Sequence, residues 1–394
     1  MLTVTRAAHA NETKSDSTLV PCQECHFLRD CGGLDGQQQL WGCFSECKST
    51  GLCNQYDWTC PCRPREFARR LAEVGGNLNP IASIFLTASL DNIELPFYVP
   101  VIHHGYRRRS RLRQRLVALP TFEVIRSHRG GTYGPVAKTA SSLRRKFRVG
   151  NNAEVLLISP THDQLLESYW EKRRAQNMPR SLLELQFIAM SLPNFSFFTD
   201  APRTHTLWNR KRLMLVAREM TESGIAAIPH LNTLTNADGV FWRDILRENP
   251  AVTVVAKEFQ TGATIDDLEW LARLQDSLKR PLHPLIIGGA RFVRAAARHF
   301  EALTLVDSQP FMKTVKRQRL SIDPYRNAKR WIAFPTKSGE FLDELLSHNI
   351  RVYEHWVRSE IALVRPQEAR QLSLRIPLPA PCCSQLSNPR RKTA

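Results

Sequence analysis

Short apolar runs alternate with helical stretches from about residue 80 to residue 308, and this alternation constrains the fold more than any other feature. The runs are apolar on both faces and often β-branched, which is typical of strands buried in a parallel sheet. The pattern predicts eight strands, at Tyr98–His104, Leu116–Thr121, Glu154–Pro160, Phe195–Asp200, Ala226–Asn232, Val252–Phe259, Pro284–Arg291 and Ala302–Ser308.

Helical stretches are expected between most of these runs, at 163–190, 206–223, 237–249, 267–280 and 291–300. Strand and helix in repeated alternation predict an α/β fold with a parallel sheet and helices outside it. Eight strands favour a closed (β/α)8 barrel-like domain. An open doubly wound sheet is the alternative. Trp331–Pro335 is a ninth candidate strand, and the connection at 105–115 is too short for a proper helix.

The barrel-like domain is expected to span residues 65–364 of the 394-residue chain. A small cysteine-rich metal-binding segment precedes it at 21–64, after a polar, flexible N-terminus at 1–20. A flexible basic tail, rich in proline and serine, follows at 365–394.

Eight of the ten cysteines fall within the segment at 21–64. The first twenty residues contain no apolar block of the kind that a secretory signal needs, so reduced thiols bound to metal are favoured over disulfides. Clustered thiolates select zinc or iron–sulfur clusters. The predicted ligands are Cys22, Cys25, Cys31, Cys43, Cys47, Cys53, Cys60 and Cys62.

The cysteine spacing favours an iron–sulfur cluster, with zinc as the alternative, because only one CxxC pair is present and the other gaps are irregular. The segment from Cys22 through Cys25 to Cys31-Gly-Gly resembles the cysteine run of SPASM-type auxiliary cluster domains. That resemblance covers about a dozen residues and implies a four-iron cluster. The family's next cysteine would fall at Asp35, so the resemblance implies a fourth ligand from elsewhere in the chain.

Ionisable and amide side chains recur where the predicted strands end. Ligands of parallel α/β folds bind beyond the carboxyl ends of the strands, so these residues are the candidate site. Two carboxylates with a histidine suit acid–base or nucleophilic chemistry. The candidate catalytic residues are Asp200, His230, Glu258 and Asp307, and the candidate substrate-binding residues are Asn232, Arg203, Lys257, Arg291 and Lys313.

Each of these residues also has a purely structural interpretation. Asp200 and Asp307 have the residue type that caps helices. His230 lies in an otherwise apolar run and could be a core histidine, while Lys257 and Glu258 could form one internal ion pair. In a closed barrel the strand ends meet at one mouth, so the catalytic interpretation predicts that the candidates surround one pocket.

The net charge of +18 and the pI of about 9.8 favour nucleic acid, nucleotides or other anions as partners. Arginine forks match phosphate geometry, although a solvated surface is the alternative interpretation. No run of eighteen apolar residues is present, so no membrane partner and a cytoplasmic location are expected. The predicted nucleic-acid contacts are Arg107, Arg108, Arg109, Arg111, Arg113 and Arg115.

The stretch Leu156–Thr314 resembles an uncharacterised bacterial α/β-barrel family, which implies a barrel but no particular reaction. The resemblance is carried by Asn194–Pro202, Pro229–Asn232 and Asp307–Lys313. In architecture and charge the chain is loosely similar to tRNA-guanine transglycosylases. That likeness implies that Asp200 and Asp307 are carboxylates of a base-exchange reaction.

Together these features predict a metal-containing barrel enzyme that acts on nucleic acid or a nucleotide. A transferase or glycosylase-like reaction, with base modification or exchange, is favoured, and the metal segment would position substrate or transfer electrons. One alternative is a non-catalytic nucleic-acid-binding protein with a structural metal module. The other is a metabolic barrel enzyme that acts on a small phosphorylated substrate.

Overall fold

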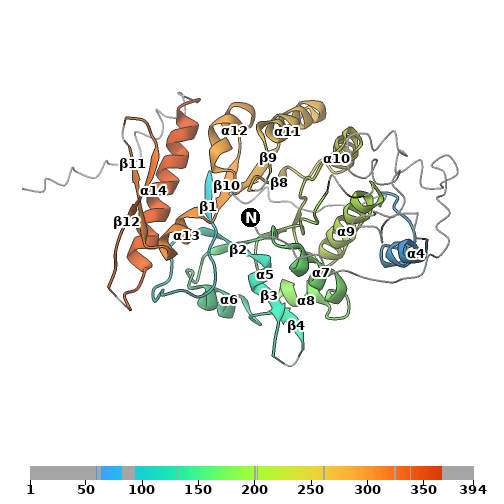
Figure 1. Cartoon of the computed structure of the whole chain (residues 1–394), viewed down its shortest axis with the longest axis horizontal. Helices are drawn as coiled ribbons and strands as arrows, with labels where there is room; N and C mark the ends of the chain where they lie inside the picture. Colours follow the sequence, from blue (N-terminus) through green and yellow to red (C-terminus); the bar gives the residue numbers. More distant parts are fainter. Residues whose placement is uncertain are drawn as a thin grey trace, which may run out of the picture.

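The computed structural model describes residues 59, 64–81, 94–129, 131–198, 201, 203–260, 262–323, 325–337 and 339–365. These residues form an α/β fold built on two parallel sheets with helices around them (Figure 1). The strands of the two sheets are β1 (Tyr98–Pro100), β2 (Leu116–Pro120), β5 (Glu154–Ile158), β6 (Ala189–Ser191), β7 (Ala227–Ile228), β8 (Val254–Glu258), β9 (His283–Ile287) and β10 (Thr304–Asp307).

The first sheet has the strand order β1-β10-β9-β8 and the second has the order β2-β5-β6-β7. The edges of the two sheets meet at two isolated parallel bridges. Val101 pairs with Ala118 beside β1 and β2, and His230 pairs with Ala256 beside β7 and β8. The backbone N–H groups of Ile102 and Leu231 donate 2.9 Å hydrogen bonds across the same two edges.

One apolar cluster draws side chains from all eight strands and lies apart from the larger core. Its members recur at every second position along a strand, which is the spacing of side chains on one face. The opposite faces of the strands pack against the helices. The cluster contains Val99, Val101, Leu116, Ala118, Leu156, Ile158, Ala189, Ile228, Val254, Ala256, Leu285, Ile287 and Val306.

Helices follow most of the strands, and within the described part of the chain none lies between β1 and β2, as the short connection predicts. None of the described helices combines the length and apolarity needed to cross a membrane. The helices are α4 (Pro64–Glu73), α5 (Thr121–Val124), α6 (Ala140–Phe147), α7 (Asp163–Lys172), α8 (Met178–Leu183), α9 (Arg203–Glu222), α10 (Asn236–Glu248), α11 (Ile265–Leu278), the 3-10 helix η3 (Ala290–Phe292), α12 (Val293–His299), α13 (Gln309–Val315) and α14 (Asp343–Ala362).

The strand predicted at Phe195–Asp200 does not form over residues 195–198, the part of it that the structure describes. The strand in this part of the chain is β6. Its first two residues fall at the end of the stretch 163–190 predicted to be helical, and its third residue follows that stretch. Leu192 still donates to the carbonyl of Ile228, but Pro193 has no N–H group and the chain leaves the sheet there. Asn194, three residues after the last residue of β6, is therefore the first polar side chain beyond this strand, and Asp200 is six residues farther along the chain.

The ninth candidate strand, Trp331–Pro335, lies outside both parallel sheets. It overlaps β12 (Lys329–Ala333), which pairs in antiparallel fashion with β11 (Gln318–Ile322). This hairpin packs against α14 at one end of the molecule, far from α4 (Figure 1). A second short hairpin joins β3 (Ile125–Ser127) and β4 (Tyr133–Pro135).

Candidate active site at the carboxyl ends of the strands

Three ionisable side chains continue the alternation of the shared apolar cluster beyond its last members. Glu258 comes two residues after Ala256, His230 two residues after Ile228, and His103 two residues after Val101. Side chains two residues apart on a strand point to the same face. The carboxyl ends of three strands thus present titratable groups above the apolar interior.

Glu258 is the last residue of β8, and an amide side chain from the loop after β6 holds its carboxylate. Asn194 Nδ2 donates a 2.6 Å hydrogen bond to Glu258 Oε2. Asn232 Nδ2 donates to Asn194 Oδ1 and to the carbonyl oxygen of Phe195. Burial raises the pKa of Glu258, although the hydrogen bond from Asn194 opposes that rise. This carboxyl group therefore keeps its proton to a higher pH than an exposed glutamate, which suits a proton donor.

His230 is fully buried beside Glu258. Its Nε2 accepts a 3.2 Å hydrogen bond from the backbone N–H of Glu258, which places the ring proton on Nδ1. Nδ1 has no hydrogen-bond partner among the described residues. Burial, together with the nearby Lys257 charge, lowers the pKa of His230 to about 3, so the ring is neutral at physiological pH. The interpretation of His230 as a core histidine agrees with this burial.

A histidine–glutamate pair lies at the carboxyl ends of β1 and β2. His103 Nδ1 and Glu123 Oε1 are 2.6 Å apart, and Glu123 Oε2 accepts a 2.7 Å hydrogen bond from the backbone N–H of His104. Burial alone would raise the pKa of Glu123, but the hydrogen bonds from His103 and His104 outweigh it and lower that pKa. A carboxylate on Nδ1 leaves His103 Nε2, which is buried and has no partner in the described part of the chain, as a proton acceptor.

Hydroxyl groups join the ends of β2, β5 and β6 between these two sets of residues. Thr121 Oγ1 and Ser159 Oγ are 3.0 Å apart. The backbone N–H of Ser159 donates to Ser191 Oγ at 2.9 Å, and Ser159 Oγ donates to the Ser191 carbonyl. All three side chains are buried and fully hydrogen-bonded, so they fix the strand ends.

Asp307 has a different environment from Glu258. Asp307 is the last residue of β10, two residues after Leu305, whose side chain belongs to the larger core between the strands and the helices. Tyr353 of α14 donates a 2.6 Å hydrogen bond to Asp307 Oδ2. Its Oδ1 accepts from the backbone N–H of Gln309 at the start of α13, which is a helix-capping contact. Burial raises the pKa of Asp307, against the hydrogen bond from Tyr353. The structure thus brings Glu258, His230 and Asn232 together and gives Asp307 other partners. Asp200 lies outside the described residues.

The other candidate substrate-binding residues have partners within the protein. Lys257 forms a 2.9 Å ion pair with Asp267 rather than with Glu258. Arg203 forms a buried two-pronged pair with Asp238, at 2.6 and 2.9 Å. Arg291 donates to the carbonyl of Ala263, and Lys313 lies 5.9 Å from the ring centre of Trp331.

The arginine run is divided between structural and exposed residues. Arg108 is only 2% exposed and donates to the carbonyls of Phe147 and Arg148, so it is not a surface contact for phosphate. Arg115 pairs with Glu94 and Glu154, and Arg111 donates to Asn151. Arg111 and Arg115 are exposed despite these contacts, as are Arg107, Arg109 and Arg113.

All eight predicted metal-binding cysteines lie outside the described residues. Within the described ranges, no group of three His, Cys, Asp or Glu side chains could hold a metal ion. The described residue closest to these cysteines in the chain is Thr59. Its Oγ1 lies 3.3 Å from His205 Nδ1, and its carbonyl accepts a hydrogen bond from Thr204.

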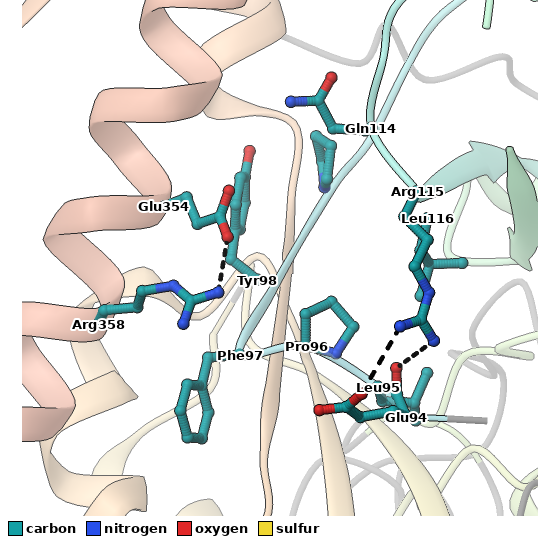
Figure 2. Close-up of a pocket in the computed structure, with 11 residues that line it drawn as sticks. Glu94, Leu95, Pro96, Phe97, Tyr98, Gln114, Arg115, Leu116, Glu354 and Arg358 are labelled. Atoms are coloured by element: carbon teal, nitrogen blue, oxygen red, sulfur yellow. Dashed lines mark hydrogen bonds and ion pairs between the residues drawn. The ribbon is translucent and has the colours of Figure 1, made fainter. Parts of the chain in front are cut away.

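Two hollows in the described part of the chain are not lined by Glu258, His230 or His103. A cavity of about 400 Å³ at the amino ends of β1 and β2 is lined by two ion pairs, Glu354–Arg358 and Glu94–Arg115 (Figure 2). A groove of about 930 Å³ is lined by α4, α7 and α9, with Trp170 and His205 among its residues. Active sites of parallel α/β folds lie at the carboxyl ends of strands, so we centre the candidate site on Glu258.

Sequence reasoning missed Asn194 as a strand-end residue and left out the His103–Glu123 pair. The misplaced strand hid Asn194, although Pro193 marked the point where a strand must end. His103 was recognisable at the end of the first run. Its partner Glu123 lies in the short helix α5, and the contact between them depends on the tertiary fold.

Comparison of the chain with family models, with curated proteins and with solved structures gave no match.

Proposed function

We propose that the two sheets form one closed (β/α)8 barrel and that the chain is an enzyme with its site at the barrel mouth. The bridges Val101–Ala118 and His230–Ala256 join the sheets at both edges, which supports closure. The apolar cluster with members from all eight strands supports it further, because a barrel interior is filled by alternate side chains of every strand.

One observation carries the enzymatic proposal. Glu258 ends β8 and Glu123 lies in α5, directly after β2, and their surroundings shift their pKa values in opposite directions. When two carboxyl groups of one site have different pKa values, the group with the higher pKa can donate a proton while the other stays ionised and supports a base. Glu258 is the general acid, held by Asn194. His103, oriented by Glu123, is the general base.

The proposed substrate is a nucleotide or nucleic acid, with modification or exchange of a base as the reaction class. The net charge of +18 supports an anionic substrate. The Nδ1–H of His230, which has no hydrogen-bond partner among the described residues, can donate to a carbonyl or ring nitrogen of a base. The amide N–H groups of Asn232 already bind Asn194 and Phe195, so its Oδ1 can accept from an amino group.

The cysteine-rich segment is proposed to hold an iron–sulfur cluster, with zinc as the alternative. This rests on the cysteine spacing. Thr59, the described residue next to Cys60 in the chain, is hydrogen-bonded to Thr204 and His205 at the start of α9. A cluster bound by the cysteines would supply electron transfer or a structural anchor.

The experiment is a ligand screen followed by product analysis. The melting temperature of the purified protein is measured with nucleoside phosphates, short RNA and DNA strands and phosphorylated sugars, and stabilising ligands are then incubated and analysed by mass spectrometry. We expect a nucleotide-containing compound to stabilise the protein and to be converted. Stabilisation by phosphorylated sugars alone would replace the nucleotide proposal with a metabolic enzyme.

A further inference from the structure

The hairpin of β11 and β12 has one face against α14 and the other exposed. Leu320 is buried, and its neighbour Arg319 is exposed. On β12 the exposed residues include Arg330 and Ile332, which pair with Ser321 and Arg319 of β11. Figure 1 shows this hairpin at the edge of the molecule, with no described element over its outer side.

The exposed face of the hairpin and its flanks is strongly basic. Residues 313–337 contain eight lysines and arginines and a single acidic residue, Asp323. Among the described residues, Asp323 forms an ion pair with Arg330. Lys316, Arg319, Arg326 and Lys337 are exposed, and no ion pair involves them in the described ranges. Like charges this dense repel one another unless an anion lies across them.

Aromatic rings lie among these charges and are exposed. Phe334, directly after β12, is 39% exposed, and the Arg319 guanidinium lies 5.6 Å from its ring centre. Phe341 is 51% exposed, and the Arg109 guanidinium lies 5.8 Å from its ring centre. Exposed phenylalanine is costly in water, and two such rings beside arginines suggest a ligand that both stacks and carries negative charge.

The arginine run and the hairpin belong to one surface. The backbone N–H of Leu342 donates to the carbonyl of Arg107, and the N–H of Phe334 donates to the carbonyl of Arg317. α13, which directly precedes β11 in the chain, also contacts the arginine side of this surface, because its Phe311 packs against the exposed Tyr106. The exposed members of the run therefore continue the charge of the hairpin.

We propose that this surface, formed by β11, β12, Arg326, Phe334, Lys337, Phe341 and Arg109, binds single-stranded nucleic acid. This inference rests on the proposed nucleic-acid substrate, and it adds that the nucleic acid is single-stranded and where on the protein it binds. Single strands expose bases that stack on aromatic rings while arginines contact the backbone phosphates. A duplex hides its base faces, so exposed phenylalanines would have nothing to stack on. An anionic membrane is the competing partner, and the test includes it.

The test measures fluorescence anisotropy of labelled short RNA and DNA strands over a range of salt concentrations. The charge variant carries Arg319→Gln, Arg326→Gln and Lys337→Gln. The affinity of the charge variant should depend less on salt. Each phosphate contact on a single strand contributes about 0.7 to the slope of log affinity against log salt concentration, so loss of three contacts should reduce that slope by about 2. The ring variant, Phe334→Leu with Phe341→Leu, should weaken binding at least about tenfold with an unchanged salt slope, because stacking is lost but charge is kept.

The matched control carries the same change of charge on other helices, Arg145→Gln, Arg180→Gln and Arg298→Gln, at exposed positions of α6, α8 and α12. Equal loss in this control and in the charge variant would overturn the proposed surface, as would preference for a duplex. Binding to vesicles of anionic phospholipid, without binding to any strand, would overturn it in favour of a membrane. Glu258→Gln should bind strands like the wild type. Full turnover by that variant would refute the proposed function and leave the surface standing.

Discussion

Asn194 donates a 2.6 Å hydrogen bond to the carboxylate of Glu258, and this contact joins the loop after β6 to the last residue of β8 across the intervening strand β7. Because an amide N–H binds a carboxylate more strongly than a carboxylic acid, it limits the rise in the pKa of Glu258 that burial causes. Asn194 is therefore a residue that tunes the proposed acid.

The first prediction concerns the pH dependence of stability. The pKa of Glu258 is raised in the folded protein, so its stabilising contribution is complete below the unfolded pKa and is lost as the pH rises through the folded pKa. Glu258→Gln removes this ionisation. The free energy of unfolding of the variant should fall less between acidic and neutral pH than that of the wild type, as measured by denaturant unfolding. Parallel pH curves for the two proteins would contradict the raised pKa.

The second prediction concerns His230. Its pKa is lowered in the folded state, so its contribution is present above the unfolded value of about 6.5 and is lost as the pH falls towards the folded value. Between these two pKa values, the free energy of unfolding should fall by about 1.4 kcal/mol for each unit by which the pH is lowered. His230→Gln keeps an acceptor near Nε2 and should reduce the slope. His230→Asn removes that acceptor and should be less stable than the Gln variant at pH 8. Equal stability of the two variants would argue against the hydrogen bond to the Glu258 backbone.

The third prediction concerns the buried charge cluster between α9 and α10. Asp238 pairs with both Arg203 and Arg210, and its side chain is fully buried. Asp238→Asn leaves two buried guanidinium groups without their anion and should lower the free energy of unfolding by about 3–5 kcal/mol. Asp244→Asn, at a half-exposed carboxylate of the same helix, is the control and should change it by less than about 1 kcal/mol. A similar small effect in both variants would show that the cluster is not a stabilising unit.

The fourth prediction concerns the metal. Anaerobically purified protein should contain iron and acid-labile sulfide and show a broad visible absorbance, because thiolate-bound clusters absorb there. Combined replacement of Cys22, Cys25 and Cys31 by Ala should remove that absorbance while the far-UV signal of the α/β domain persists. Colourless protein with stoichiometric zinc would contradict the cluster and leave a structural zinc module.

Sequence periodicity identified the parallel α/β class because buried strands such as β5 and β9 leave a continuous apolar run. It failed at β6, where only three residues pair and the more apolar stretch after Pro193 forms no strand. The site was predictable where a strand simply ends in a polar residue, as β8 does at Glu258. It was not predictable where two distant residues meet. Asp307 meets Tyr353, and His103 meets Glu123, only through the packing of α14 and α5.

The central claim is that Glu258 transfers a proton in the reaction, and its most direct test is the turnover of Glu258→Gln on a substrate found in the ligand screen. Loss of a general acid should lower the turnover number by about 100-fold or more while substrate binding, measured separately, is retained. Glu248→Gln, at an exposed glutamate of α10, should react like the wild type. Turnover by Glu258→Gln at the rate of Glu248→Gln would contradict the account.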